Sequence, residues 1–232
     1  MEKINDLREL LKHELNDLYS AETQMIDALP DLIKSATSKQ LKAALSDHLK
    51  VTQSQKTRLD KVRKLLNDEK VEEKKGFFAN LFSSKEGEEH CKAMEGLIKE
   101  AHSLTDEDMT PEVMDAAIIA AAQKVEHYEI SSYGTAKAYA MQLGLVEVAQ
   151  LLNATLDEEY AADDSLTVLA VGKVNLDAGA TKKIPVHKSL QASAAPVVKK
   201  TPAKKTTNKK SSTGTRTAAT SKSATKNKKT TR

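Results

Sequence analysis

The sequence predicts an all-α protein: an antiparallel bundle of four long helices and one short helix over residues 1–170, followed by a disordered basic tail over residues 171–232. Apolar residues in the first 170 positions recur at steps of three and four, the period of a helix buried along one face. Aromatic residues make up only 3% of the chain and Trp is absent, which is typical of an aliphatic helical core.

Charge divides the chain at the same place. Residues 171–232 contain 16 Lys and Arg but a single acid, Asp177, so this segment carries a net charge of +15. The remaining residues carry −12, and the total of +3 therefore conceals two segments of opposite charge. Large apolar side chains are almost absent after Val198, so the tail cannot bury enough surface to offset its conformational entropy.

Cysteine usage and hydropathy indicate a cytoplasmic protein. Cys91 is the single cysteine, which excludes an internal disulfide and fits a reducing compartment. No apolar segment follows Met1 as in a signal peptide, and no run approaches the roughly 18 apolar residues of a membrane span. We expect no membrane interaction.

The first two helices are predicted over residues 2–29 and 38–67. The Leu29-Pro30 step predicts the end of the first helix, although a helix that restarts with Pro30 at its first position is an alternative. Ser38 is the expected N-cap of the second. The inner stripe of the first helix is Ile4, Leu7, Leu11, Leu15, Leu18, Met25 and Leu29.

Three further helices follow a predicted loop over residues 71–87 that contains every Phe of the chain: Phe77, Phe78 and Phe82. A short helix is predicted over residues 88–103. The fourth helix begins with Thr110 as N-cap and Pro111 at its first position, and it continues to about residue 141. Gly144 interrupts the pattern, and the fifth helix is predicted over residues 145–170.

Acids lie on the apolar stripes of three of these helices. Four residues after Leu18, the first helix places Glu22 on its inner face. The same spacing puts Glu126 and Glu129 inside the fourth helix, and Glu159 and Asp163 inside the fifth. His48 lies on the stripe of the second helix, whereas His127 projects toward the edge, where an ordinary surface or interface histidine is expected.

Buried carboxylates need a partner, because an isolated desolvated charge is very costly. Carboxylate oxygens with an imidazole inside four long helices are typical of a di-iron or di-manganese site. The six candidate metal ligands are Glu22, His48, Glu126, Glu129, Glu159 and Asp163. The alternative is that each acid leans to the edge of its stripe and forms salt bridges or contacts with solvent.

Three segments make the chain recognisable: residues 19–24 (YSAETQ), 91–98 (CKAMEGLI) and, above all, 120–130 (AAAQKVEHYEI). Over residues 1–170 the sequence resembles the ferritin-like family of the YciE and YciF stress proteins of enteric bacteria. The resemblance implies a ferritin-like helical bundle that dimerises, a stress-associated role and a dimetal centre. The biochemical activity of that family is poorly defined, so the resemblance implies a fold more than a reaction.

One segment departs from the family pattern. Where the family typically has His-Leu-Glu-Glu-Thr, residues 48–52 read HLKVT. Position 51 is expected on the inner stripe beside His48, so Val51 removes a carboxylate from the centre, and Lys50 replaces an acid with a base. The remaining ligands are then expected to hold one ion, or two weakly, and a degenerate centre kept for structure is an equal alternative.

The tail has the composition of a nucleic-acid-binding segment. Lys-rich sequence punctuated by Pro can contact phosphates without reading bases, so we expect non-specific DNA binding. A tail that solubilises the protein or binds an acidic partner is the alternative. Membrane binding is disfavoured because no amphipathic apolar face accompanies the charge. The cations are Lys199, Lys200, Lys204, Lys205, Lys209, Lys210, Arg216, Lys222, Lys226, Lys228, Lys229 and Arg232.

Two classes of function remain open from sequence. The first is an enzyme that consumes peroxide or oxygen at an iron or manganese centre held by the six candidate ligands. The second is a metal-free, homodimeric scaffold that presents basic tails to DNA as a nucleoid-associated protein. The two are compatible, since a tail that holds a peroxide-consuming bundle on DNA would protect the DNA.

Overall fold

A computed structural model describes residues 4–73 and 90–180, with side chains described over 4–67 and 90–180. The predicted loop over residues 71–87 falls mostly outside these ranges, together with its three Phe residues. Only residues 71–73 are described, and they belong to a helix. The basic tail from residue 181 onward, with all twelve predicted DNA contacts, also lies outside them.

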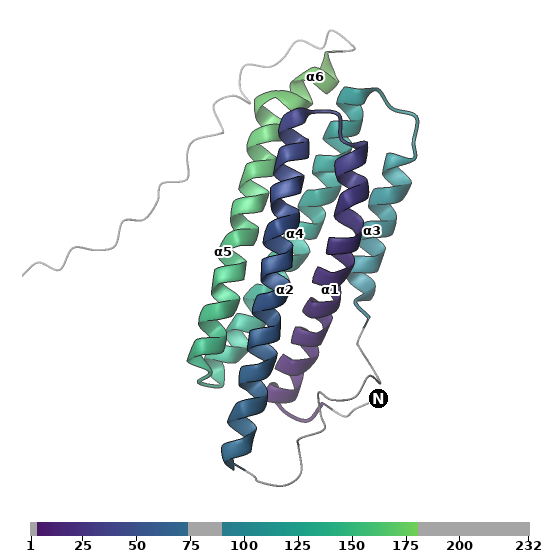
Figure 1. The fold of residues 1–232 in the computed structure, drawn as a ribbon. Coiled ribbons are helices and arrows are strands. Elements are labelled where there is room, and N and C mark those ends of the chain that lie inside the picture. Colours follow the sequence, from purple (N-terminus) through teal and green to yellow (C-terminus); the bar gives the residue numbers. More distant parts are fainter. Residues whose placement is uncertain (1–3, 74–89, 181–232) are drawn as a thin grey trace, which may run out of the picture. The chain divides into compact units, whose positions relative to one another are not determined.

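The described residues form helices and no strands, as the sequence predicts (Figure 1). Four are long: α1 (Leu7–Ser35), α2 (Lys39–Glu73), α4 (Pro111–Gln142) and α5 (Val146–Leu169). Helix α3 (Lys92–Thr105) is short. A π-helical turn (Ala170–Val174) and α6 (Asn175–Gly179) extend α5, so the helical region ends nine residues beyond the predicted boundary at 170. None of the described helices is long and apolar enough to cross a membrane.

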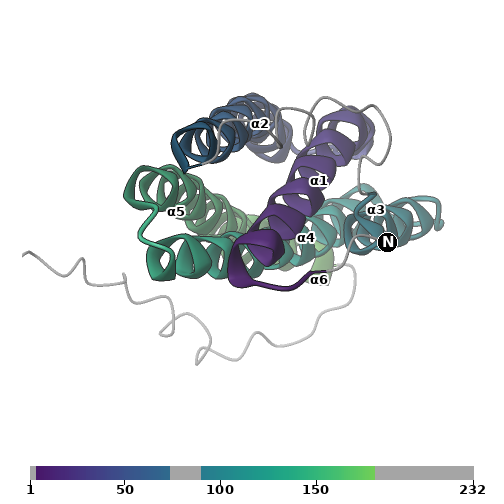
Figure 2. The same cartoon turned by 90° about the horizontal axis from the view of Figure 1, so that it is seen from below.

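The four long helices pack in the cyclic order α1, α2, α5, α4, and each is antiparallel to its neighbours (Figures 1 and 2). Because α2 and α4 run in the same direction, the chain must return to the other end of the bundle between them. Helix α3 makes part of that return along α1 and α4. One long connection of this kind is characteristic of ferritin-like bundles.

Helix α1 does not end at the Leu29-Pro30 step, so the predicted end was wrong. Pro30 lies inside α1 on its exposed face. Ala28, Leu29 and Leu32 around it are all buried in the core. The helix therefore continues because its apolar face keeps packing through this turn, which offsets the hydrogen bond that Pro removes.

The turn between α4 and α5 follows the prediction at Gly144. This residue adopts φ +73°, a left-handed conformation in which a Cβ would be strained. The amide of Leu145 donates to the carbonyl of Ala140 at 2.9 Å, and the amide of Gly144 to that of Met141 at 3.1 Å. These bonds satisfy carbonyl groups at the end of α4 in the manner of a Schellman motif.

Helix α3 is attached to α1 through Cys91, its N-cap residue. The Cys91 amide donates to Ser20 Oγ at 2.9 Å, and Gln24 Nε2 donates to the Cys91 carbonyl at 3.0 Å. Its thiol lies 3.1 Å from Asp17 Oδ2 and 3.0 Å from the hydroxyl of Tyr128 on α4. The single cysteine is a buried free thiol that joins three helices.

The core consists of two apolar clusters separated by a polar layer. One cluster surrounds Met25, Leu45 and Ile118, next to α3. The other surrounds Leu15, Leu59 and Leu152 at the opposite end of the bundle. Between them lie buried polar side chains from all four long helices: Glu22, Thr52, Gln55, Glu126, Glu129, Thr155 and Glu159.

The α1–α2 connection is fixed by an acid on α4 that sequence reasoning did not find. Buried Asp115 accepts hydrogen bonds from the Thr37 amide at 2.6 Å, the Thr37 hydroxyl at 2.7 Å and the Ser38 amide at 2.8 Å. Ser38, the predicted cap, contributes one longer bond to the Leu41 amide, at 3.4 Å. A carboxylate from another helix therefore fixes the two residues that precede α2, and Ser38 supplies the predicted cap bond to the first turn.

We predict that Asp115→Ala lowers the free energy of unfolding by about 3 kcal/mol, since three donors lose a charged acceptor. Chemical denaturation followed by circular dichroism measures this difference. Asp108→Ala, which removes an exposed acid just before α4, is the control and should change stability by less than about 0.5 kcal/mol. Equal effects of the two substitutions would contradict the role of Asp115 in fixing the α1–α2 connection.

Candidate metal centre

The polar layer brings together side chains from three helices at one point. His48 of α2, Glu126 and Glu129 of α4, and Glu159 of α5 each present a nitrogen or oxygen atom, and these four atoms all lie within 4.8 Å of one another. The three carboxylates are at most 2% exposed, and the imidazole is 10% exposed. Four of the six predicted ligands therefore converge as expected.

Glu22 reaches the same layer from α1 but lies outside this group of four. It is fully buried, and its Oε1 accepts a hydrogen bond from the hydroxyl of Tyr133 on α4. Its carboxylate is near enough to the group to raise the pKa of Glu129. Tyr133 is also fully buried, and the sequence alone does not reveal its role because a tyrosine on an apolar stripe resembles an ordinary core residue.

Asp163, the sixth predicted ligand, is not brought into the group. Its side chain is 20% exposed, accepts a hydrogen bond from Gln123 Nε2 at 3.0 Å, and lies 3.4 Å from His127 Nε2. Position 163 is one turn beyond Glu159, where the stripe has rotated to the α4–α5 edge. His127 is 69% exposed, consistent with the surface role expected for it.

The substituted segment of α2 is arranged differently from the prediction. Val51 is half-buried, whereas Thr52 and Gln55 are each 1% exposed and occupy the inner positions below His48. Lys50 is exposed and pairs with Asp47 at 2.8 Å. The base at position 50 therefore does not enter the polar layer, and Val51 lies at its margin.

Burial changes the pKa values of all these acids in one direction. Desolvation and the neighbouring carboxylate of Glu159 raise the pKa values of Glu22, Glu126 and Glu129 well above the usual range. Desolvation likewise raises the pKa of Glu159 to about 7. Because Glu159 contributes to the shift of every other acid, it is the electrostatic centre of the group.

Burial shifts the pKa of His48 in the opposite direction. Burial lowers the pKa of His48 to about 4, so its imidazole is neutral at pH 7. Nε2 of His48 lies 3.3 Å from Glu126 Oε1, but this distance does not represent an ion pair at neutral pH. A neutral imidazole with a free ring nitrogen is the form that binds metal ions.

Buried atoms of the group lack hydrogen-bond partners. These atoms are Glu22 Oε2, His48 Nε2, Glu126 Oε2, Glu129 Oε1 and both oxygens of Glu159. Buried polar atoms in native proteins almost always have a partner, so this set requires protons or a bound cation. Hard carboxylate oxygens and one imidazole suit iron or manganese, and the residues present fit such an ion.

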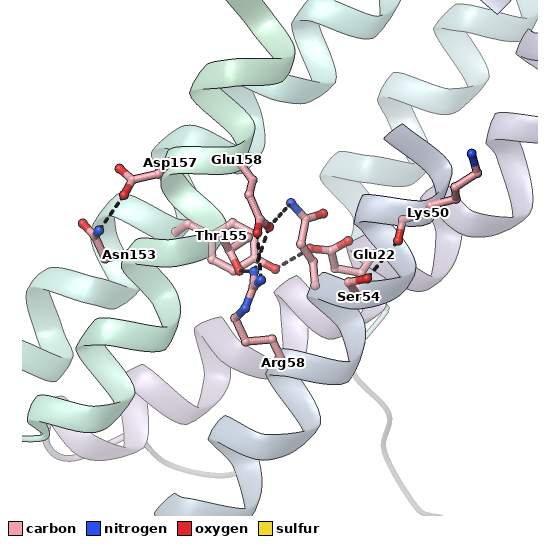
Figure 3. A network of polar contacts seen from close by, with 10 residues as sticks. Glu22, Lys50, Ser54, Arg58, Asn153, Thr155, Asp157 and Glu158 are labelled. Carbon is pink, nitrogen blue, oxygen red and sulfur yellow. Dashed lines mark hydrogen bonds and ion pairs between the residues drawn. The ribbon is translucent and has the colours of Figure 1, made fainter. Parts of the chain in front are cut away.

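A shell of polar side chains borders the centre between α2 and α5 (Figure 3). Arg58 donates to both oxygens of Glu158 at 2.8 Å and to Thr155 Oγ1 at 2.7 Å. Gln55 Nε2 donates to Glu158 Oε2 at 3.2 Å. Arg58 lowers the pKa values of Glu22 and Glu159 and so opposes their desolvation.

Sequence reasoning missed this shell. In the sequence, Arg58 and Glu158 look like ordinary surface charges beside the apolar stripes of α2 and α5. Their pairing depends on how α2 and α5 are aligned, which periodicity alone does not determine.

Comparison with known proteins identifies the family of the chain. The family model described as Domain of unknown function (DUF892) matches residues 6–87 and 77–179. The chain belongs to this family. Protein YciF of Escherichia coli K12 is 42% identical over 169 residues, which cover 73% of this chain and 93% of YciF.

Solved structures of similar proteins agree with the fold. The crystal structure of the E. coli stress protein YciF matches with a TM-score of 0.63 and 42% identity, covering 74% of this chain and 99% of that one. YcfI from Rhodopseudomonas palustris matches with a TM-score of 0.62 and 40% identity, covering 72% and 96%. A Xanthomonas campestris protein, 20% identical, shows the fold alone, with a TM-score of 0.54.

The family model ends at residue 179, so the basic tail lies beyond it. Since the match already includes 93% of YciF, that relative has no segment of similar length to residues 181–232. The DUF892 portion and the tail therefore pose separate functional questions.

The pKa shifts predict how the stability of the metal-free protein depends on pH. A carboxyl group with a raised pKa binds more protons in the folded than in the unfolded state, so its contribution to stability falls as the pH rises through the interval between its pKa values in the two states. For Glu159 the interval runs from about pH 4.5 to about pH 7. His48 has a lowered pKa, so its contribution to stability rises with pH between about pH 4 and pH 6.5. This single group is outweighed by the four carboxyl groups. We expect the melting temperature to fall by at least about 5 °C between about pH 5 and pH 8.

Thermal melts of chelator-treated protein measure this dependence. Glu159→Gln should flatten it, because the substitution removes the central titrating group. Asp164→Asn, at an exposed position of α5, is the matched control and should leave it unchanged. A melting temperature that rises across the range in the wild-type protein would contradict the assigned protonation states.

Proposed function

We propose that the chain is a stress-associated, ferritin-like protein that binds iron or manganese at His48, Glu126, Glu129 and Glu159. The observation that carries this proposal is the set of buried ligand atoms, within 4.8 Å of one another, of which several lack any hydrogen-bond partner. The similarity to the E. coli stress protein YciF supports the stress-associated part.

The electrostatics support Glu159 as the central ligand of the group that would hold the metal. It raises the pKa of each of the other three buried acids, and both of its oxygens are without partners. Glu22, whose buried Oε2 also lacks a hydrogen-bond partner, would be a further ligand if the centre holds two ions. This arrangement supports no more than two ions per chain.

The surrounding residues would position these ligands. Burial and the neighbouring Glu22 raise the pKa of Tyr133, so its hydroxyl keeps its proton. Tyr133 therefore donates a hydrogen bond that holds the Glu22 carboxylate in place. Arg58 holds Glu158, which precedes Glu159 on α5. A bound redox metal would supply electron transfer to peroxide or oxygen at this centre.

A metal-free structural bundle is the second candidate. The observation that favours it is the direction of the carboxyl pKa shifts, since protonated acids would remove most of the mutual repulsion. The departure from the family pattern at Val51 is compatible with it. The two candidates differ in whether purified protein holds metal.

Metal binding separates them. Protein prepared without chelator should contain iron or manganese, and Glu129→Ala and Glu159→Ala should each weaken its affinity by at least about tenfold. Val51→Glu should increase occupancy, because it places a carboxylate at the margin of the centre. Elemental analysis and calorimetric titration measure these changes, with Asp164→Ala as an exposed-acid control on α5. A wild-type protein without metal, unaffected by Val51→Glu, would favour the structural bundle.

We further propose that the tail binds DNA without sequence preference and associates the protein with the nucleoid. Residues 181–232 contain 15 Lys and Arg and no acid, whereas residues 1–180 carry a net charge of −12 and should repel phosphate. The tail contains no aromatic residue to stack on bases. If the chain forms the homodimer that its family resemblance implies, two tails would act together and raise avidity.

Salt dependence tests the tail. If six to ten cations contact phosphates, affinity for duplex DNA should fall about 10³ to 10⁵-fold between about 50 and 200 mM salt. Fluorescence anisotropy with two unrelated duplexes should give similar affinities. A chain ending at Ala180 is the control and should not bind. Equal binding by the shortened chain, or an affinity indifferent to salt, would contradict the proposal.

A further inference from the structure

A small cavity of about 20 Å³ lies beside the candidate metal centre. Its walls come from α1, α2, α3 and α4, and most of them are apolar, including Met25, Leu29, Leu45 and Ile98. His48 and Glu126 also line it. The cavity therefore borders the group of four on the side of α2 and α4, within the apolar cluster next to α3.

Small side chains account for the space. Ala28 of α1, Ala101 of α3, and Ala121 and Ala122 of α4 all line the cavity. Protein interiors are otherwise packed to the density of organic crystals, so four alanines facing one point leave a void. Helix α3 covers this region from outside by packing on α1 and α4 (Figure 2).

Size restricts the occupant to a molecule of two or three heavy atoms at most. A cavity needs roughly 10 to 15 Å³ to hold one water molecule, so this one is only slightly larger. Any larger organic substrate is excluded without rearrangement of the helices.

Polarity restricts it further. A stable buried water needs two to four polar partners. His48, Glu126 and His102 line the cavity, but nearly all of the surface that its walls present is apolar, whether or not a metal is bound. Hydrogen peroxide, with two hydroxyl donors, would also be left unsatisfied against apolar walls. Dioxygen is diatomic and apolar and needs no hydrogen bond.

We propose that this cavity is a dioxygen-binding pocket that opens onto His48 and Glu126. The inference rests on the proposed metal centre, because a bound reducing metal would give dioxygen a reaction partner. It goes beyond that proposal by selecting dioxygen over peroxide as the molecule that approaches from the α3 side.

Dioxygen can be located in the metal-free, full-length protein by its paramagnetism. Methyl resonances of Met25, Leu29 and Leu45 should relax several-fold faster under oxygen pressure than those of Leu15 and Leu59, which are equally buried in the other apolar cluster. Equal relaxation of the two sets would overturn the proposal. So would an ordered water in the cavity that oxygen does not displace.

A second test fills the cavity with larger side chains. Ala121→Val should abolish the enhanced relaxation, and Ala101→Val serves the same purpose from α3 if the first variant is unstable. Ala138→Val places the same change on an exposed face of α4 and should have no effect. Enhanced relaxation that persists in both filled variants would place dioxygen elsewhere and overturn the proposal.

The metal-loaded protein separates this inference from the metal proposal. With bound ferrous iron, Ala121→Val should slow oxidation by dioxygen several-fold while leaving both iron affinity and oxidation by hydrogen peroxide unchanged. Equal slowing with both oxidants would overturn the assignment to dioxygen. Failure to bind iron at all would instead contradict the metal centre, and the relaxation experiment would still report on the pocket.

Discussion

The arrangement of this bundle depends on one costly feature, the burial of four carboxylates and an imidazole between two apolar clusters. Glu22, Glu126, Glu129 and Glu159 cannot all be ionised there without compensation, since their desolvation and mutual repulsion act in the same direction. The nearby cation, Arg58, is already bonded to Glu158. Protons or metal ions must therefore supply the missing positive charge. Each choice leads to a different function: protons leave a structural bundle, and metal ions make a redox centre available.

Periodicity alone placed five of the six candidate ligands in the buried polar layer. The stripes of the long helices identified Glu22, His48, Glu126, Glu129 and Glu159, because a residue's side on a helix follows from its spacing. Asp163 was misplaced because a stripe read one turn farther drifts to the edge of the interface. Pro30 was read as a helix end because local preference was weighed without the tertiary packing around it. Asp115, Tyr133, Arg58 and Glu158 act through partners on other helices, and those partners depend on helix alignment that a single sequence does not reveal.

The chain joins two segments with different physical requirements. The DUF892 portion ends with the helical region near residue 179, and it is acidic. The basic segment that follows has no counterpart of similar length in YciF. The two segments therefore carry net charges of opposite sign. The proposals for the polar layer and for the tail are therefore independent of each other, and each has its own test.

Anomalous diffraction from crystals grown with iron or manganese tests the central claim most directly, because it reports both the presence and the position of the ion. The account predicts a peak at the polar layer, within bonding distance of His48 Nε2 and of oxygens from Glu126, Glu129 and Glu159. A second peak would lie between Glu159 and Glu22. Absence of any peak at this layer in metal-saturated crystals, with the carboxyl groups hydrogen-bonded to one another instead, would contradict it.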